Sequence, residues 1–187
     1  INGLGFEGFI ERLAKTSAPK SAPISLSNGA ATLDIAKDEH GHDEPGHDHD
    51  GGVDPHAFQS VANAQIYVRN IAEAYCKSDT ANCDAYKANA AAYDIKLAAL
   101  DAEIRAAVDS IPADKRIVIT SHDAFRYFAN AYGLTFHAPE GISTESEASA
   151  ADVAKLIDQI RDEKASAVFV ENISDPRLIE QISKEAG

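Results

Sequence analysis

The sequence contains no methionine or tryptophan, only two cysteines, and few basic residues, with 17 Lys and Arg against 30 Asp and Glu. Its formal net charge of −13 argues against binding to nucleic acid or to an anionic membrane surface, because both favour Lys and Arg. No apolar run is long enough to span a bilayer. What remains is a globular composition with an acidic surface that is compatible with attracting cations.

The first and last residues of the sequence are typical of segments from within a longer chain. There is no initiator methionine and no signal peptide. The opening INGLGFEGF is typical of a strand end and a turn, and Gly187 is placed as the residue that ends a helix. We therefore expect these 187 residues to be a fragment, or a processed form, of a longer protein.

The two cysteines, Cys76 and Cys83, flank KSDTAN at an expected turn between two helices. Their spacing is too long for a zinc knuckle. A Cys76–Cys83 disulfide would suit an oxidising compartment such as a periplasm. The alternative is two unpaired thiols.

Hydrophobic periodicity divides the sequence into two lobes and a connecting helix. Steps of three and four between apolar residues predict one unusually long helix over 84–110. It would be roughly 40 Å long, more than one small domain needs, so we expect it to bridge the lobes. The first lobe, 1–83, is predicted to contain a helix over 6–14, a strand within 21–30 and a helix from Asp54 to about Cys76.

The second lobe, 111–187, alternates strands and helices joined by short links. This order predicts a parallel sheet with right-handed crossovers. The fold class is therefore α/β, with two lobes of parallel sheets and flanking helices bridged by one long helix. In parallel sheets, ligands bind at the carboxyl ends of the strands.

Residues 37–53 form a His-rich segment with almost no apolar content, which we expect to be a mobile loop. Acidic residues alternate there with His40, His42, His47 and His49. Neutral imidazoles favour zinc, copper and nickel, so this loop is a candidate auxiliary metal site of moderate affinity. The alternative is a solvated acidic linker.

Two further histidines are candidates for a rigid metal site. Asp54 and Pro55 suit a helix cap and a first helical position, which would place His56 in the first turn of a helix. His122 follows the strand RIVIT at the ligand end of the sheet. Each histidine alone fits a capping or surface role equally well, but together they favour a metal site between lobes.

Other polar residues near these histidines have weaker claims. Glu171, at the end of VFVE, is a candidate either to bind the metal or to support a ligand. Asp123 is a candidate to support a ligand, whereas His137 fits a structural role at a strand end. Ser121, His122 and Asp123 are consecutive, so they do not converge as a hydrolase triad, and no nucleophile elbow is present. The HEXXH motif of zinc proteases is absent as well.

The motifs DPHAFQSVANAQIYVRNIAEA, ITSHDAFRYFANAYGL and VFVENISDPRLIEQISKEAG, together with NGLGFEGFIERL, resemble the periplasmic metal-binding proteins of ABC importers. The resemblance follows the family's order over almost the whole sequence, and DPH and SHDAF are its most specific parts. The zinc branch, the ZnuA-type proteins, is the most similar, since it also carries an acidic His-rich insertion before DPH.

The resemblance implies two lobes bridged by a long helix, with a zinc ion held between them and no enzymatic activity. It assigns His56 and His122 as the second and third histidine ligands of the zinc site. The manganese branch usually has glutamate at the third position, so His122 favours zinc. The remaining ligands, a histidine before NGLG and an acid after Gly187, are expected outside this sequence. Phe58 stands where the family commonly has tryptophan.

The implied function is delivery of Zn²⁺ to an ABC permease in the inner membrane of a Gram-negative bacterium, from the periplasm. A zinc metallochaperone is a further expected partner. Three alternatives stay open. One is a manganese or iron receptor of the same fold, and another is a zinc-dependent hydrolase with Asp123 or Glu171 as its general base. The third is a metal store or chaperone that uses only the loop, for which His56 and His122 would be dispensable.

Overall fold

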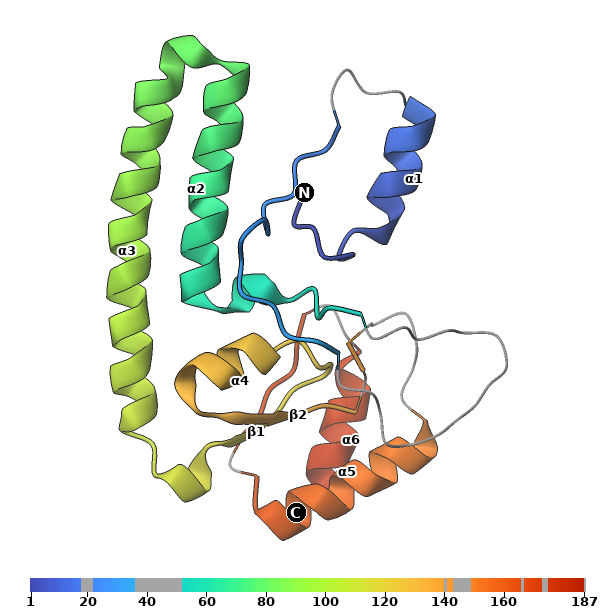
Figure 1. Ribbon diagram of the computed structural model, residues 1–187. Coiled ribbons are helices and arrows are strands. Elements are labelled where there is room, and N and C mark those ends of the chain that lie inside the picture. The colour runs from blue at the N-terminus through green and yellow to red at the C-terminus, as the bar shows by residue number, and fades with distance from the viewer. Residues whose placement is uncertain are drawn as a thin grey trace. The chain divides into compact units, whose positions relative to one another are not determined.

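The computed structural model describes residues 1–17, 22–35, 52–139, 141–142, 149–165, 167–172 and 175–186. The chain divides into two compact units, Ile1–Ala99 and Leu100–Gly187. The boundary between them falls within one long helix, α3 (Figure 1). The histidines of the expected loop, His40, His42, His47 and His49, lie outside the described residues.

The first unit is mainly helical. Its elements are α1 (Gly8–Ser17), the 3₁₀ turn η1 (Ala57–Gln59), α2 (Val61–Ser78), the 3₁₀ turn η2 (Thr80–Asn82) and most of α3 (Cys83–Asp109). An antiparallel bridge joins Asp34 to Val53. These residues lie shortly before and shortly after residues 36–51, which are outside the described part of the chain.

The strand expected within 21–30 is wrong, because the described part of this range contains a turn over 26–29. The side chain of Asn70, on α2, donates hydrogen bonds to the carbonyl oxygens of Leu26 (2.7 Å) and Asn28 (2.9 Å). A helix side chain thus satisfies backbone groups that a neighbouring strand would otherwise bond.

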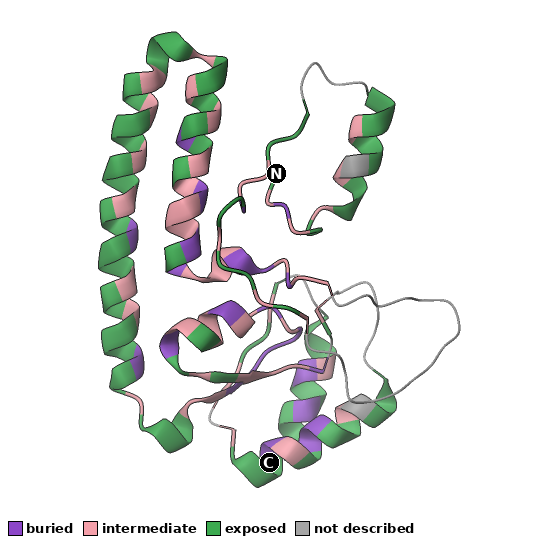
Figure 2. Ribbon diagram, in the orientation of Figure 1, coloured by how far each residue is buried: buried purple, intermediate pink, exposed green. Residues whose placement is uncertain are grey.

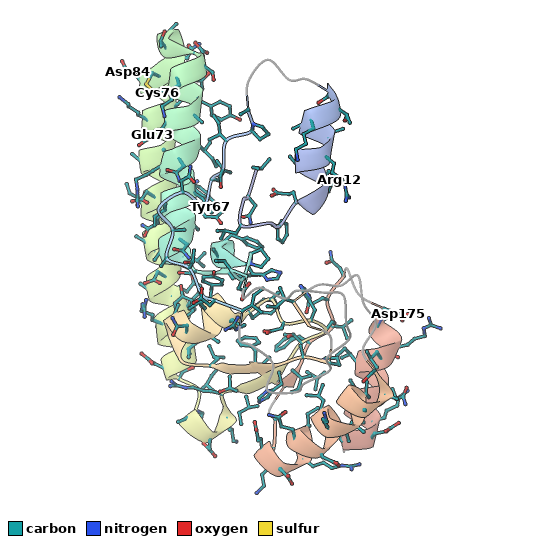
Figure 3. All side chains as sticks on the ribbon, turned by 45° about the vertical axis from the view of Figure 1, so that its right-hand side comes forward. Arg12, Tyr67, Glu73, Cys76, Asp84 and Asp175 are labelled. Atoms are coloured by element: carbon teal, nitrogen blue, oxygen red, sulfur yellow. A yellow bond between two sulfur atoms is a disulfide. The ribbon has the colours of Figure 1, made fainter. Side chains whose placement is uncertain are left out.

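Helices α2 and α3 run side by side as an antiparallel hairpin (Figures 1 and 3). The predicted long helix is confirmed within one residue at each end. A Cys76–Cys83 disulfide closes the tip of the hairpin, as expected. Next to it, the rings of Tyr75 and Tyr86 lie 5.3 Å apart, and the Tyr86 hydroxyl donates to Asp79 at 2.8 Å.

Removing this disulfide should destabilise the hairpin. The two cysteines are 7 positions apart. A disulfide that closes so short a loop restricts the unfolded chain and thereby stabilises the folded protein by about 2–3 kcal/mol. We expect a Cys76→Ser/Cys83→Ser variant to lose about this much free energy of unfolding in urea titrations. A reducing agent should lower the stability of the unaltered protein and leave the double variant unchanged; equal stability of the two proteins would contradict a structural role.

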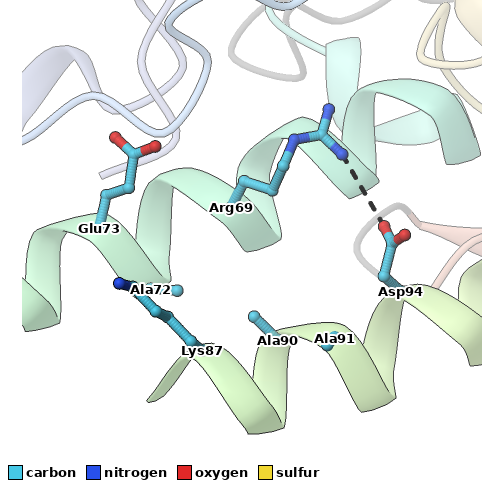
Figure 4. A pocket seen from close by; sticks show the side chains of 7 residues that line it. All are labelled: Arg69, Ala72, Glu73, Lys87, Ala90, Ala91 and Asp94. Atoms are coloured by element: carbon cyan, nitrogen blue, oxygen red, sulfur yellow. Dashed lines mark ion pairs between the residues drawn. The ribbon is translucent and has the colours of Figure 1, made fainter. Parts of the chain in front are cut away.

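A groove of about 340 Å³ runs between α2 and α3 (Figure 4). Alanines form its apolar part and charged side chains surround them, with one ion pair, Arg69–Asp94, at 3.9 Å. Its lining is Arg69, Ala72, Glu73, Lys87, Ala90, Ala91 and Asp94. Because this lining contains no histidine or cysteine, the groove is a poor candidate for a zinc site.

The second unit contains the predicted parallel sheet. Strand β1 (Ile117–Ile119) pairs in parallel with β2 (Thr135–His137) on one side and with β3 (Ala167–Val168) on the other. The helices are α4 (Arg126–Tyr132), α5 (Ala150–Glu163) and α6 (Pro176–Ala186), and a 3₁₀ turn, η3 (Ala113–Lys115), precedes the sheet. Gly133 ends α4 in the left-handed conformation (φ 73°), which glycine adopts without a steric penalty.

Isoleucine and leucine side chains from the sheet, α5 and α6 form the core of this unit (Figure 2). Their spacing of three and four residues puts one apolar face of each helix towards the sheet. The buried members are Ile119, Leu156, Ile157, Ile160, Ile179 and Ile182. None of the described helices is both long and apolar enough to cross a membrane.

The end of α3 is fixed to α4 within the second unit. The Tyr132 hydroxyl donates to Asp101 at 2.8 Å, and the Arg105 guanidinium lies over the Tyr132 ring at 5.1 Å. Arg105 also donates to Asp101 and, at 3.2 Å, to the carbonyl oxygen of Ala131. These contacts explain why the last ten residues of α3 belong to the second unit and the rest of the helix to the first.

Candidate metal centre

His56 is a buried side chain held by a buried carboxylate. Its ring Nδ1 lies 2.8 Å from Asp54 Oδ1, and its backbone N–H donates to the same oxygen at 3.0 Å. Asp54 is fully buried and His56 is 4% exposed. A neutral imidazole that donates Nδ1–H to a carboxylate keeps the lone pair on Nε2, which is the atom that binds a metal ion.

Two phenylalanine rings pack against the imidazole of His56. Phe6 meets the imidazole edge to face with centroids 5.8 Å apart, and Phe58 lies 6.1 Å away. The two phenylalanines are also in edge contact with each other, at 5.4 Å. Contacts with these rings limit the rotation of the imidazole, which favours a fixed ligand.

The expected helical position of His56 needs correction. Helix α2 begins at Val61, and His56 instead precedes the 3₁₀ turn η1. Asp54 therefore does not cap a long helix. Its carboxylate spans two residues to the N–H of His56, a local bond that aspartate forms readily, and the ring of His56 is bonded at the same time.

His122 has an analogous arrangement in the second unit. It lies three residues after β1, is 6% exposed, and its Nδ1 is 2.6 Å from Glu171 Oε2. The other oxygen of Glu171 accepts the backbone N–H groups of Ser121 (3.0 Å) and His122 (3.3 Å). Helix α4 begins only at Arg126, so the histidine lies in the loop between strand and helix rather than at a helix start.

Glu171 follows β3 closely, which explains its contact with His122. Strands β1 and β3 are parallel neighbours, so their carboxyl ends meet at one edge of the sheet. Both residues were expected at the ligand end of the sheet, and the structure places them there next to each other. Asp123 also lies at this edge, where its backbone N–H donates to the carbonyl oxygen of Gly141 at 3.1 Å.

His137 belongs to a separate cluster on β2 and α5. Its Nε2 lies 2.8 Å from Glu163 Oε2, and Gln159 donates to the same glutamate at 2.9 Å. Hydrogen bonds from Gln159 and His137 lower the pKa of Glu163. This histidine thus uses its Nε2 for a carboxylate, unlike His56 and His122, which use Nδ1.

The described residues contain no group of three or more His, Cys, Asp or Glu side chains suited to hold a metal ion. The two candidate ligands are each held separately, His56 in the first unit and His122 in the second. Sequence analysis missed the partner of His56, since Asp54 was interpreted as a helix cap. The i to i+2 spacing of aspartate and histidine in DPH is the signal that would have indicated this pair.

The chain belongs to the ZnuA family, described as zinc-uptake complex component A, periplasmic, whose model matches residues 1–187. Its fold is that of solved receptors of this type. The periplasmic zinc binding protein TroA from Treponema pallidum superposes with a TM-score of 0.85 at 27% identity, over 99% of this chain and 63% of that one. A crystal structure of ZnuA gives a TM-score of 0.79 at 28% identity, over 99% and 66%.

Curated relatives carry names for other metals. The manganese ABC transporter substrate-binding lipoprotein PsaA of Streptococcus pneumoniae is 37% identical over 136 residues, which is 73% of this chain and 44% of that protein. The iron ABC transporter substrate-binding lipoprotein MtsA of Streptococcus pyogenes serotype M1 is 37% identical over 137 residues. The chain spans under half the length of these relatives.

Proposed function

We propose that the protein is a zinc receptor that binds Zn²⁺ through Nε2 of His56 and of His122 and delivers it to an ABC permease for uptake. Family membership supports a solute-binding role over an enzymatic one. The observation that carries the proposal is the repeated pairing of a buried histidine Nδ1 with a carboxylate, Asp54 in one unit and Glu171 in the other. Such carboxylate–histidine pairs orient metal ligands and raise their basicity.

Zinc is the proposed metal because both ligands are nitrogen donors. Imidazole suits zinc, whereas manganese favours carboxylate, carbonyl and water oxygens. The names of the relatives keep manganese and iron as the second candidate, since PsaA and MtsA are named for those metals.

Competition between metals tests this choice. We expect the protein to bind zinc at least about ten-fold more tightly than manganese, following the order of divalent metals at nitrogen-rich sites. The measurement is a chelator competition titration on a variant with His40, His42, His47 and His49 changed to alanine, so that the loop's own zinc preference does not contribute. Equal or tighter manganese binding would support the manganese or iron receptor instead.

The four loop histidines are proposed to collect zinc and pass it to His56 and His122. The permease would receive zinc from these two residues, and a metallochaperone is a further proposed exchange partner. The periplasm of a Gram-negative bacterium is the proposed location, and the disulfide suits an oxidising compartment. A zinc hydrolase would need an open metal position with a base beside a bound water. Glu171 instead lies 2.6 Å from His122 Nδ1 through one oxygen and accepts two backbone N–H groups through the other, which favours an orienting role.

A further inference from the structure

The turn that carries His56 is held by residues from two other segments and by a hydrogen bond within the turn itself. The backbone N–H of Asp54 donates to the carbonyl oxygen of Leu33 at 2.9 Å. The carbonyl oxygen of Pro55 accepts from the Asn2 side chain at 3.1 Å. His56 itself accepts from Gln59 N–H at 3.0 Å, which closes the 3₁₀ turn. The position of the imidazole therefore depends on bonds made before and after it in the chain.

Asn63, on the first turn of α2, bonds the residue that follows His56. Its amide nitrogen donates to the carbonyl oxygen of Ala57 at 3.0 Å, and Ala57 is fully buried. The same nitrogen donates to the carbonyl oxygen of Ala31 at 2.9 Å, while Oδ1 accepts the Ala31 N–H at 2.9 Å. Asn63 is 3% exposed, so its amide makes three bonds to protein where water has little access.

The hydrogen bonds between Asn63 and Ala31 also act on His56, through the residues that precede it in the turn. Ala31 is two residues from Leu33, whose carbonyl oxygen bonds the N–H of Asp54. Asp54 in turn holds the His56 ring through Oδ1. Asn63 thus fixes both flanks of the turn, directly at Ala57 and through the Ala31–Leu33 segment at Asp54.

We propose that Asn63 is a positioning residue for metal binding, which sets the orientation of the His56 imidazole through Ala57 and through Ala31, Leu33 and Asp54. This inference rests on the proposed role of His56 as a ligand. Replacing a residue that orients a metal ligand typically lowers metal affinity about 10- to 100-fold. Loss of Asn63 should therefore weaken zinc binding and weaken the preference of His56 for the Nδ1–H tautomer that its 2.8 Å contact with Asp54 favours.

Asn70 provides a matched control on the same helix. It also donates two side-chain hydrogen bonds to backbone carbonyl oxygens, those of Leu26 and Asn28. Neither acceptor belongs to the turn of His56 or to the Ala31–Leu33 segment. An Asn70→Ser variant consequently removes a similar number of bonds between α2 and the preceding chain without touching the proposed path.

The test compares Asn63→Ser with Asn70→Ser in the loop-alanine background. Zinc affinity is measured by competition titration, and the tautomers of His56 and His122 by long-range ¹H–¹⁵N correlation in the metal-free protein. We expect Asn63→Ser to lower zinc affinity about ten-fold or more, to average the ring nitrogen signals of His56 and to leave those of His122 unchanged. Asn70→Ser should change neither. Equal effects of the two variants, or an unchanged His56 tautomer in a folded Asn63→Ser protein, would overturn the proposal.

If the Asn63→Ser variant does not fold, Asn63→Gln is used in its place. It keeps both amide functions but moves them by one methylene, so an affected His56 spectrum with an intact His122 spectrum supports positioning. An unchanged His56 spectrum with wild-type affinity overturns it. The tautomer of His56 is measured without metal, so it tests the role of Asn63 independently of zinc binding. Whether His56 is a ligand is tested separately, because wild-type zinc affinity in a His56→Ala variant would show that it is not.

Discussion

Changing His56 and His122 together to alanine should abolish the tightest zinc-binding event of the protein. Loss of residues that only orient a ligand typically costs about 10- to 100-fold in affinity, so loss of two ligands should cost at least about 100-fold. The measurement is a chelator competition titration of the double variant beside the unaltered protein. The weaker binding that we assign to the loop histidines should persist.

Two variants control for general effects of losing imidazoles. His137→Ala removes a histidine that is also paired with a carboxylate, Glu163 at 2.8 Å, and should keep the tight event. The quadruple alanine variant of the loop should keep it too and lose only the weaker binding. If the tight event instead disappears with the loop and survives in the double variant, the protein is a flexible zinc collector and the proposed ligands are wrong.

Asp54→Asn and Glu171→Gln should each lower zinc affinity by about 10- to 100-fold. Both changes keep the size of the side chain and remove its charge. Each carboxylate lies next to Nδ1 of a proposed ligand, at 2.8 Å for His56 and 2.6 Å for His122. A neutral amide would hold the imidazole less strongly and make Nε2 a weaker donor to zinc.

Glu163→Gln is the matched control, since it neutralises a carboxylate of comparable geometry beside His137. Its zinc affinity should equal that of the unaltered protein. Thermal unfolding of all three variants separates lost affinity from lost structure. Wild-type affinity in a folded Asp54→Asn protein would mean that the Asp54–His56 pair serves only the fold.

The parallel sheet and the contact between His122 and Glu171 could be predicted because both follow from local patterns. Short apolar runs alternating with amphipathic helices define parallel neighbours, and residues after neighbouring strands meet at one edge. The long helix was equally predictable, since its apolar residues keep a helical spacing from Tyr86 to Val108.

Long-range bonds between side chain and backbone account for what sequence analysis missed. The residues around Leu26 have the composition of a strand, but Asn70, 44 positions away, bonds the Leu26 carbonyl oxygen in a turn. The roles of Asn2 and Asn63 around His56 are hidden in the same way, because nothing near either asparagine indicates its acceptor. At DPH, two local functions compete for one aspartate, and bonding to the histidine prevails over capping a helix.

The most direct test follows all seven histidines of the unaltered protein in ¹H–¹⁵N correlation spectra as zinc is added. We predict that the Nε2 signals of His56 and His122 shift together over the first equivalent of zinc. The loop histidines should respond only to further zinc, and His137 should stay unchanged. A first equivalent that shifts His40, His42, His47 or His49 while His56 and His122 keep their metal-free signals would contradict it.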